Sequence, residues 1–244
     1  MNSKEKILVA ICNYNHSQYL KESIESIQNQ TYQNLDICVI DDRSDNQEEV
    51  LDIMEQFRSD PRVRLFANES NKGKWFCLNK AIETTDAIIC TSHDADDVSL
   101  SQRIEGQYRV MKQTNTIHNL CGFYHCWNEE HVEKYKNMTF PKEKQIEFIN
   151  AEDTSKIVLQ GYQLPHINHY YTGNFETAGV SGMFYKAIWD YGTRFLPANQ
   201  GLRVLLSEDS DFNFRVTATY GKTSITAEKL YCYRRNTSTN TEQM

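Results

Sequence analysis

The chain has 244 residues with a formal net charge of −7; 39% of them are hydrophobic and 24% are charged. This length and composition are typical of an ordinary globular domain and exclude a disordered or fibrous chain. The negative balance argues against non-specific binding to nucleic acid or acidic lipid, both of which need a surplus of Lys and Arg. Because no apolar run is long enough to span a membrane, we expect a cytoplasmic protein, for which a peripheral membrane contact stays open.

Predicted strands and predicted helices alternate through the first 100 residues. Residues 7–12 form a continuous apolar, β-branched run typical of a strand buried on both faces, and apolar residues then recur at helical spacing up to residue 30. Further strands are expected at 35–40, 63–66 and 86–91, with helices near 45–57 and 74–82. This alternation predicts an α/β fold with a parallel, doubly wound sheet.

The second half of the chain is less regular. Residues 119–176 are rich in aromatic residues, Asn and His but show no sustained period, and a stretch of that length inside a compact domain is usually functional. An apolar segment follows at 178–196, then a predicted helix at 208–220 and a predicted strand at 223–233.

Polar clusters follow three of the predicted strands at the point where each strand ends. They are Asn13-Tyr14-Asn15 after the first strand, Asp41-Asp42 after the second, and Asp94-Ala95-Asp96-Asp97 after the fourth. In parallel sheets ligands bind beyond the carboxyl ends of the strands. The sequence therefore predicts one ligand site built from these three clusters.

The cluster from Asp94 to Asp97 indicates a bound divalent cation. Carboxylates gathered after a buried strand repel one another, and their burial is costly unless a cation compensates. Mg²⁺ or Mn²⁺ would do so through oxygen ligands and would also bridge to the phosphates of a nucleotide. A solvated turn that caps the next helix is the alternative.

Other polar residues fit the same site, each with an alternative. The carboxylate of Asp41 could accept a hydrogen bond from a nucleobase N–H, with Tyr14 beside it, or it could cap a helix. Lys74, in the glycine-containing loop NKGK, suits a diphosphate or is an ordinary surface lysine. Asp209 is either a general base for an acceptor hydroxyl or a cap of the helix predicted at 208–220.

Taken together, these segments resemble the family-2 glycosyltransferases of GT-A fold. The resemblance begins at ILVAICNYNHSQYLKESIESIQNQTYQNLDICVIDDRSD, continues through NKGKWFCLNKAIE and SHDADDVSLSQRIEGQ, and resumes at GVSGMFYKAIWDYG, SEDSDFNFRV and LYCYRRN. It implies a single GT-A domain over residues 1–244, a Rossmann-like α/β fold with a mixed, mostly parallel central sheet. Residues 1–100 would form the nucleotide-sugar-binding half and residues 101–244 the acceptor-binding half.

The resemblance also implies roles at the donor site. Asp41 would bind the base, usually uracil, in a pocket that Cys12 and Tyr14 line. Asp94 would contact the ribose or the sugar, and Asp96 would coordinate Mn²⁺ or Mg²⁺ at the diphosphate, with Asp94 beside it in the metal site.

At the acceptor side, the resemblance makes Asp209 the general base and gives Glu208 a part in placing the acceptor. Such enzymes invert the anomeric centre by one direct displacement. Family members often have a His just after the Tyr-Arg-Arg run, where this chain has Asn236. Either the ligand set is smaller here, or Arg234 and Arg235 contact the diphosphate as fixed cations.

The leading hypothesis is therefore metal-dependent transfer of a sugar from a UDP-sugar to a hydroxyl acceptor such as a glycan. A nucleotidyltransferase is one rival, but it would normally show a glycine-rich phosphate loop near the first strand. A binding module without turnover is a second. Sugar transfer to a modified base in nucleic acid is a third, and the negative charge speaks against it. The stretch 119–176, with Trp127, either shapes the acceptor site or is a packed insertion.

Overall fold

The computed structural model describes residues 5–140, 146–150, 169–172, 175–200 and 207–235. In chain order its first elements are β1 (Ile7–Asn13), α1 (Ser17–Gln28), β2 (Leu35–Asp41), α2 (Gln47–Glu55), β3 (Val63–Ala67), α3 (Lys74–Glu83) and β4 (Ile89–Asp94). The next are β5 (Val98–Ser99), α4 (Arg103–Thr114), β6 (His118–Cys126), α5 (Glu129–Lys136) and β7 (Ile146–Asn150). The last are β8 (His169–Thr172), β9 (Phe175–Ala178), the 3₁₀ turn η1 (Gly179–Ser181), β10 (Met183–Tyr185), α7 (Ala187–Asp190), α8 (Glu208–Tyr220) and β11 (Lys222–Arg234).

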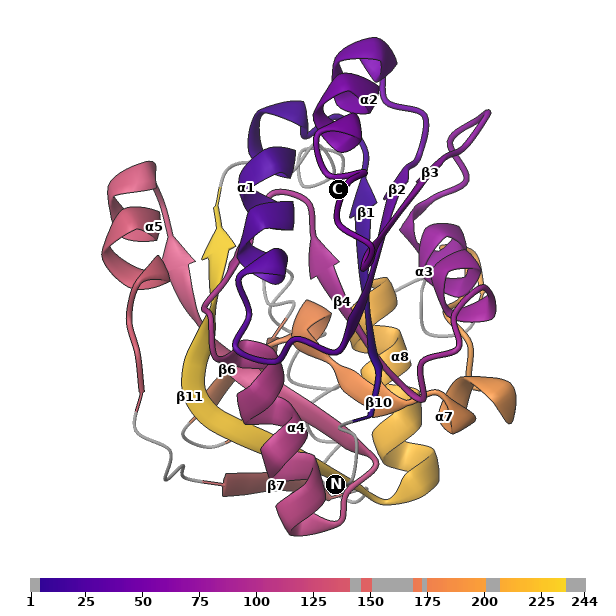
Figure 1. Cartoon of the computed structure of the whole chain (residues 1–244). Coiled ribbons are helices and arrows are strands. Elements are labelled where there is room, and N and C mark those ends of the chain that lie inside the picture. Colours follow the sequence, from indigo (N-terminus) through magenta and orange to yellow (C-terminus); the bar gives the residue numbers. More distant parts are fainter. Residues whose placement is uncertain (1–4, 141–145, 151–168, 173–174, 201–206, 236–244) are drawn as a thin grey trace.

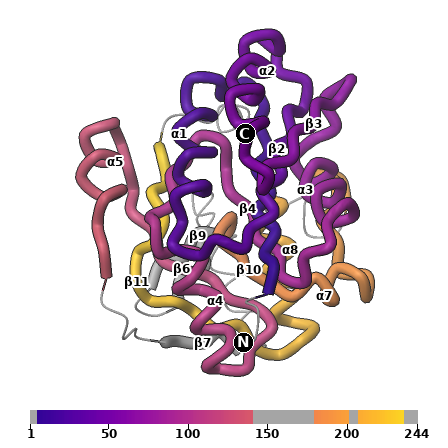
Figure 2. Tube along the Cα trace, in the orientation of Figure 1, coloured from indigo at the N-terminus to yellow at the C-terminus, as the bar shows by residue number. Residues whose placement is uncertain are grey.

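One mixed sheet runs through the molecule in the order β3-β2-β1-β4-β10-β6-β11-β5. The pairs β1–β2, β1–β4, β2–β3 and β6–β11 are parallel, whereas β10 runs antiparallel to both β4 and β6. The long strand β11 crosses from its pairing with β7 to an end beside α5 (Figure 2). The predicted mixed, mostly parallel α/β sheet is thus confirmed.

Helices cover the two faces of the sheet, and the alternation of side chains along β1 explains why. Ile7, Val9 and Ile11 pack in one buried cluster with residues of α1, α2 and α4. Leu8 and Ala10 point the other way, into a cluster with α3, α7 and α8. Figure 1 shows the two groups of helices on opposite sides of the sheet. Because helices cover both faces of the sheet, the sequence of β1 is a continuous apolar run.

Two expectations about the strands need correction. The fourth strand begins at Ile89 and not at residue 86, since Ile88 ahead of it is 48% exposed and only lengthens the apolar run in the sequence. The stretch 119–176 contains all but the first residue of the nine-residue strand β6, which lies inside the sheet. Its first residues His118 and Asn119 are fully buried, and their hydrogen bonds to Asn213 and Ser224 replace the apolar contacts that a hydropathy pattern would detect.

Among the described residues, no helix combines the length and the apolar character that crossing a membrane requires.

Candidate active site

The three polar clusters meet at one edge of the sheet, as the sequence predicted. In the strand register Asn13 lies opposite Asp41, and Cys12 lies opposite Asp94. The end of β1 therefore sits between the ends of β2 and β4. Cys12 and Tyr14 are partly exposed there, so both can line a ligand pocket.

The carboxylate of Asp41 is fully buried and anchors the turn after β2. Its Oδ1 accepts hydrogen bonds from Asn13 Nδ2 at 2.9 Å and from Ser44 Oγ at 2.6 Å, while Oδ2 accepts from the Ser44 backbone N–H at 3.2 Å. Oδ2 also accepts a long hydrogen bond from Gln47 Nε2, at 3.4 Å. A carboxylate can accept about four hydrogen bonds, so a further donor would have to displace one of these four, and the Gln47 bond is the longest.

Asp42 has a function that the sequence reasoning did not assign. Its carboxylate accepts hydrogen bonds from the backbone N–H groups of Lys72 and Gly73, at 3.0 and 2.7 Å, and from Asn68 Nδ2 at 2.7 Å. Gly73 has φ +89°, a conformation that side chains other than glycine's rarely adopt. Asp42 thus folds the loop that leads into Lys74. The sequence signal for this role was the pair of adjacent acidic residues at the end of the strand. Adjacent side chains point to opposite faces, so only one of the two can face the ligand.

Lys74 joins the donor-side and acceptor-side carboxylates. Its Nζ lies 2.5 Å from Asp94 Oδ1 and 3.0 Å from Asp209 Oδ2. These residues begin α3, end β4 and lie in the first turn of α8, so one ammonium group links three segments that are far apart in the sequence. The three side chains are 22%, 23% and 12% exposed, so water only partly screens their charges.

Burial and neighbouring charges shift the ionisation of this group. Burial lowers the pKa of Lys74, but the carboxylates of Asp209, Asp94 and Glu208 outweigh it and raise that pKa well above its usual value. Burial raises the pKa of Asp209 to about 6, against the opposing attraction of Lys74. Asp209 Oδ1 is buried without a hydrogen-bond partner among the described residues, so this oxygen has acceptor capacity that the protein leaves unused.

The N-terminus of α8 shows which residue caps this helix. The capping residue is Ser207, whose Oγ accepts a hydrogen bond from the Ser210 backbone N–H at 3.4 Å. Asp209 is therefore not needed as the cap and turns its carboxylate to Lys74. Glu208 occupies the first position of the helix beside it.

The predicted metal cluster is brought together by the structure. Ligand oxygens of Asp94, Asp96 and Asp97 all lie within 4.8 Å of one another. Asp97 is fully buried; its Oδ1 accepts the Arg234 backbone N–H at 2.8 Å, and its Oδ2 has no partner within the described part of the chain. Burial, with the charges of Asp96 and Asp94, raises the pKa of Asp97 well above its usual range. Three hard oxygen donors, one of them orphaned, fit Mg²⁺ or Mn²⁺.

Arg234 lies beneath this cluster. Its guanidinium donates to the Asp96 carbonyl at 2.8 Å and to Glu129 at 3.0 and 2.9 Å, and it forms an ion pair with Glu22. The side chain is 3% exposed. These contacts connect Arg234 to α1, to α5 and to the turn of residues 94–97, which we call the metal loop. We call Arg234 the brace of this loop. The expected contact with a diphosphate would require the guanidinium to leave these carboxylates.

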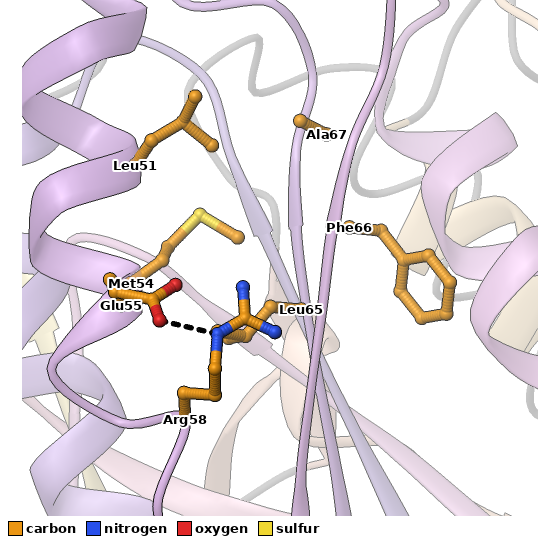
Figure 3. A pocket seen from close by; sticks show the side chains of 7 residues that line it. All are labelled: Leu51, Met54, Glu55, Arg58, Leu65, Phe66 and Ala67. Carbon is orange, nitrogen blue, oxygen red and sulfur yellow. Dashed lines mark hydrogen bonds and ion pairs between the residues drawn. The ribbon is translucent and has the colours of Figure 1, made fainter.

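A separate cavity of about 230 Å³ lies between α2 and β3 (Figure 3). Its lining residues are Leu51, Met54, Glu55, Arg58, Leu65, Phe66 and Ala67. The polar groups there are an ion pair, Arg58 Nε to Glu55 Oε1 at 2.5 Å, so they already neutralise each other. The cavity is no part of the carboxylate site around Lys74, since none of its lining residues belongs to that site.

Comparisons with known proteins agree with this geometry. Residues 8–191 match the sequence profile of the family Glycosyl transferase family 2. The uncharacterized glycosyltransferase MJ1057 of Methanocaldococcus jannaschii is 34% identical over 115 residues, which are 47% of this chain and 40% of that protein. The O-antigen biosynthesis glycosyltransferase WbnJ of Escherichia coli is 32% identical over 111 residues, 46% of this chain and 43% of that protein.

Solved structures share the fold at low sequence identity. The Staphylococcus aureus protein TarS, residues 1–349 in complex with UDP-GlcNAc, superposes with a TM-score of 0.69 at 15% identity, over 99% of this chain and 61% of that one. The mannosyltransferase PcManGT of Pyrobaculum calidifontis, in complex with GDP-Man and Mn²⁺, gives 0.62 at 14% identity, over 98% and 59%.

The chain thus spans less than half of the curated relatives and about three fifths of the solved structures. The profile match nevertheless extends over most of the chain, from β1 to the end of α7, and includes the strand ends that carry Asp41 and Asp94. The chain belongs to glycosyltransferase family 2, and its fold is the GT-A fold.

Proposed function

We propose that this protein transfers a sugar from a nucleotide-sugar to a hydroxyl acceptor, with inversion at the anomeric carbon and Asp209 as the general base. The observation that carries the proposal is the bridge from Asp94 through Lys74 to Asp209. It puts a carboxylate of the metal cluster and a buried carboxylate with an unused oxygen on either side of one cation. A single displacement needs this combination: charge stabilisation at the leaving group and a proton acceptor at the attacking group.

The donor would be a UDP-sugar. Its base would lie beyond the ends of β1 and β2, where Cys12 and Tyr14 are partly exposed. A uracil N–H would replace Gln47 Nε2 as the donor to Asp41 Oδ2, which is the longest of the four hydrogen bonds to that carboxylate. UDP and UDP-GlcNAc are the ligands of the TarS complexes, and GDP-Man is that of PcManGT, so a guanine nucleotide is the alternative donor.

Asp96 and Asp94 would hold a divalent metal, with Asp97 supporting the loop beneath them. When bound, the metal supplies positive charge to the departing diphosphate. Arg234 keeps the loop in place through the Asp96 carbonyl and Asp97. Lys74, which stays protonated, is placed to exchange its ion pairs for the phosphate oxygens when the donor enters.

In the transfer step, Asp209 accepts the proton of the acceptor hydroxyl. The acceptor oxygen forms its bond to the anomeric carbon on one face while the bond to the diphosphate oxygen breaks on the other, and the diphosphate leaves with the electron pair. A pKa of about 6 suits this task, since Asp209 is then mostly ionised at neutral pH yet basic enough to accept a proton. Glu208, at the start of the same helix, would help to place the acceptor.

This division of labour assigns residues 1–100 to the nucleotide-sugar and residues 101–244 mainly to the acceptor. A direct test is the metal-dependent hydrolysis or transfer of radiolabelled UDP-sugars by the wild type and by Asp209→Asn. The wild type should release UDP, and the variant should release it far more slowly while still binding UDP. If the variant turned over at the wild-type rate, Asp209 would not be the base.

A further inference from the structure

An exposed tryptophan stands beside the metal loop. Trp127 follows the last residue of β6 and is 57% exposed, although most large apolar side chains of this protein are buried. A single exposed apolar residue has no meaning by itself. The surroundings of Trp127 are what distinguish it.

The indole lies against two neighbouring side chains. Its ring stacks on that of His125, with centroids 6.2 Å apart and planes at 25°. The guanidinium of Arg235 lies 5.8 Å from the centre of the Trp127 ring and 4.7 Å from that of Tyr233, and its Nε donates to His125 Nδ1 at 2.8 Å. We call the three side chains of Trp127, His125 and Arg235 the aromatic platform.

The aromatic platform contacts the core through one ring and is tied to its surroundings by two backbone hydrogen bonds. The buried Phe123 packs edge-on against His125, with ring centroids 4.7 Å apart. The Arg235 backbone N–H donates to the Cys126 carbonyl at 2.9 Å, and the Trp127 backbone N–H donates to His131 Nδ1 at 3.3 Å. A rigid aromatic surface loses little conformational entropy when a ligand binds to it.

The platform also lies next to the proposed reaction centre. Tyr231, Tyr233 and Arg235 alternate along the end of β11, so their side chains share one face of the strand. On that face the Asp94 backbone N–H donates to the Tyr231 hydroxyl at 3.2 Å, and Arg235 lies over the Tyr233 ring. A ligand that rests on Trp127 would therefore lie on the side of β11 that contacts Asp94.

We infer that the aromatic platform receives a pyranose ring of the acceptor, so that the acceptor is a glycan. A pyranose offers an apolar face of C–H groups, which stacks on an indole, and a rim of hydroxyl groups, which pair with charged and imidazole nitrogens. A platform with an aromatic face and polar groups at its edge matches both. The inference rests on the proposed function and narrows its acceptor to a carbohydrate.

The test uses the full chain with UDP and Mn²⁺ and measures its binding of methyl glycosides by saturation-transfer NMR and titration. The probes are the methyl glycosides of glucose, galactose, N-acetylglucosamine and glucuronic acid. We expect at least one to bind the wild type and Trp127→Ala to weaken that binding about tenfold or more, the effect of about 1.4 kcal/mol of lost contact. Trp127→Phe should keep most of it.

Tyr191→Ala is the matched control, because Tyr191 is 86% exposed and follows α7, on the opposite side of the molecule from α5 (Figure 1). It should leave glycoside binding unchanged. Calorimetry of UDP with Mn²⁺ distinguishes a failure of the platform from a failure of the proposed function. Two results would overturn the platform alone, provided that UDP binds normally. One is equal glycoside binding by the wild type and Trp127→Ala, and the other is no binding of any probe to the wild type. Failure of the wild type to bind UDP would remove the proposed function as well.

Discussion

Replacing Lys74 by methionine removes the ammonium group that joins Asp94 to Asp209 but keeps a side chain of similar length. At the 3.0 Å between Nζ and Asp209 Oδ2, Coulomb's law gives about 1.4 kcal/mol in water and about 5.5 kcal/mol at an effective dielectric constant of 20. The lysine side chain is 22% exposed, so we expect a value between these limits. A loss of about 2 kcal/mol in the free energy of unfolding corresponds to a decrease of roughly 4–8 °C in Tm for a protein of this size.

The loss should depend on pH, with a sign that follows from Asp209. Its pKa in the folded protein is about 6, above the ordinary value of 3.8, so the folded state holds the proton more tightly and stability falls as the pH rises through this window. Lys74 offsets part of the cost of the ionised form. Its removal should therefore matter more at pH 8 than at pH 5, where Asp209 is mostly protonated in either protein.

The assay is thermal unfolding of the wild type, Lys74→Met and Lys72→Met at pH 5 and pH 8 in metal-free buffer. Lys72 is the matched control, because it is an exposed lysine two residues away, and the described contacts involve its backbone and not its ammonium group. Equal decreases in Tm for the two variants, or a decrease for Lys74→Met that is the same at both pH values, would refute the electrostatic role of Lys74.

Three further changes test the other parts of the site. Asp209→Asn should keep metal-dependent UDP binding but lower transfer about 10²–10⁴-fold, and the wild-type kcat/KM should fall on the acid side with an apparent pKa of about 6; both are measured by UDP release. Asp96→Ala should abolish the metal-dependent part of UDP binding in calorimetry, with the thermal unfolding curve little changed. Arg234→Met should lower the free energy of unfolding by about 2 kcal/mol in denaturant titrations, because the hydrogen bonds of the buried guanidinium to Glu129 and the Asp96 carbonyl are lost, and a wild-type value would contradict the brace.

Much of the first half of the fold could be predicted from the sequence, because its strands are buried on both faces. Runs such as residues 7–12 and 35–40 can only be accommodated in the middle of a covered sheet, and the polar residues that end them mark its ligand edge. The grouping of Asp94, Asp96 and Asp97 followed from the same rule. Their spacing along the chain is short, so the local turn alone brings their oxygens together.

Contacts that depend on tertiary folding could not be predicted in the same way. β6 escaped detection because His118 and Asn119 satisfy their polar groups inside the core, where a hydropathy pattern records only a break. The sequence suggested that Arg234 is a cation for the diphosphate, but it could not show that Glu22 and Glu129 come from two helices to surround it. Ion pairs between residues a hundred or more positions apart produce no periodic pattern in the sequence.

Calorimetric titration tests whether the carboxylate site around Lys74 binds a nucleotide diphosphate together with a divalent cation. The protein is titrated with UDP, GDP, CDP and ADP, each in the presence of Mn²⁺ and again with EDTA. We expect UDP to bind with Mn²⁺ and to lose most of its affinity with EDTA, while the other three nucleotides bind more weakly. If none of the four nucleotides bound in the presence of Mn²⁺, the proposed donor site would be contradicted.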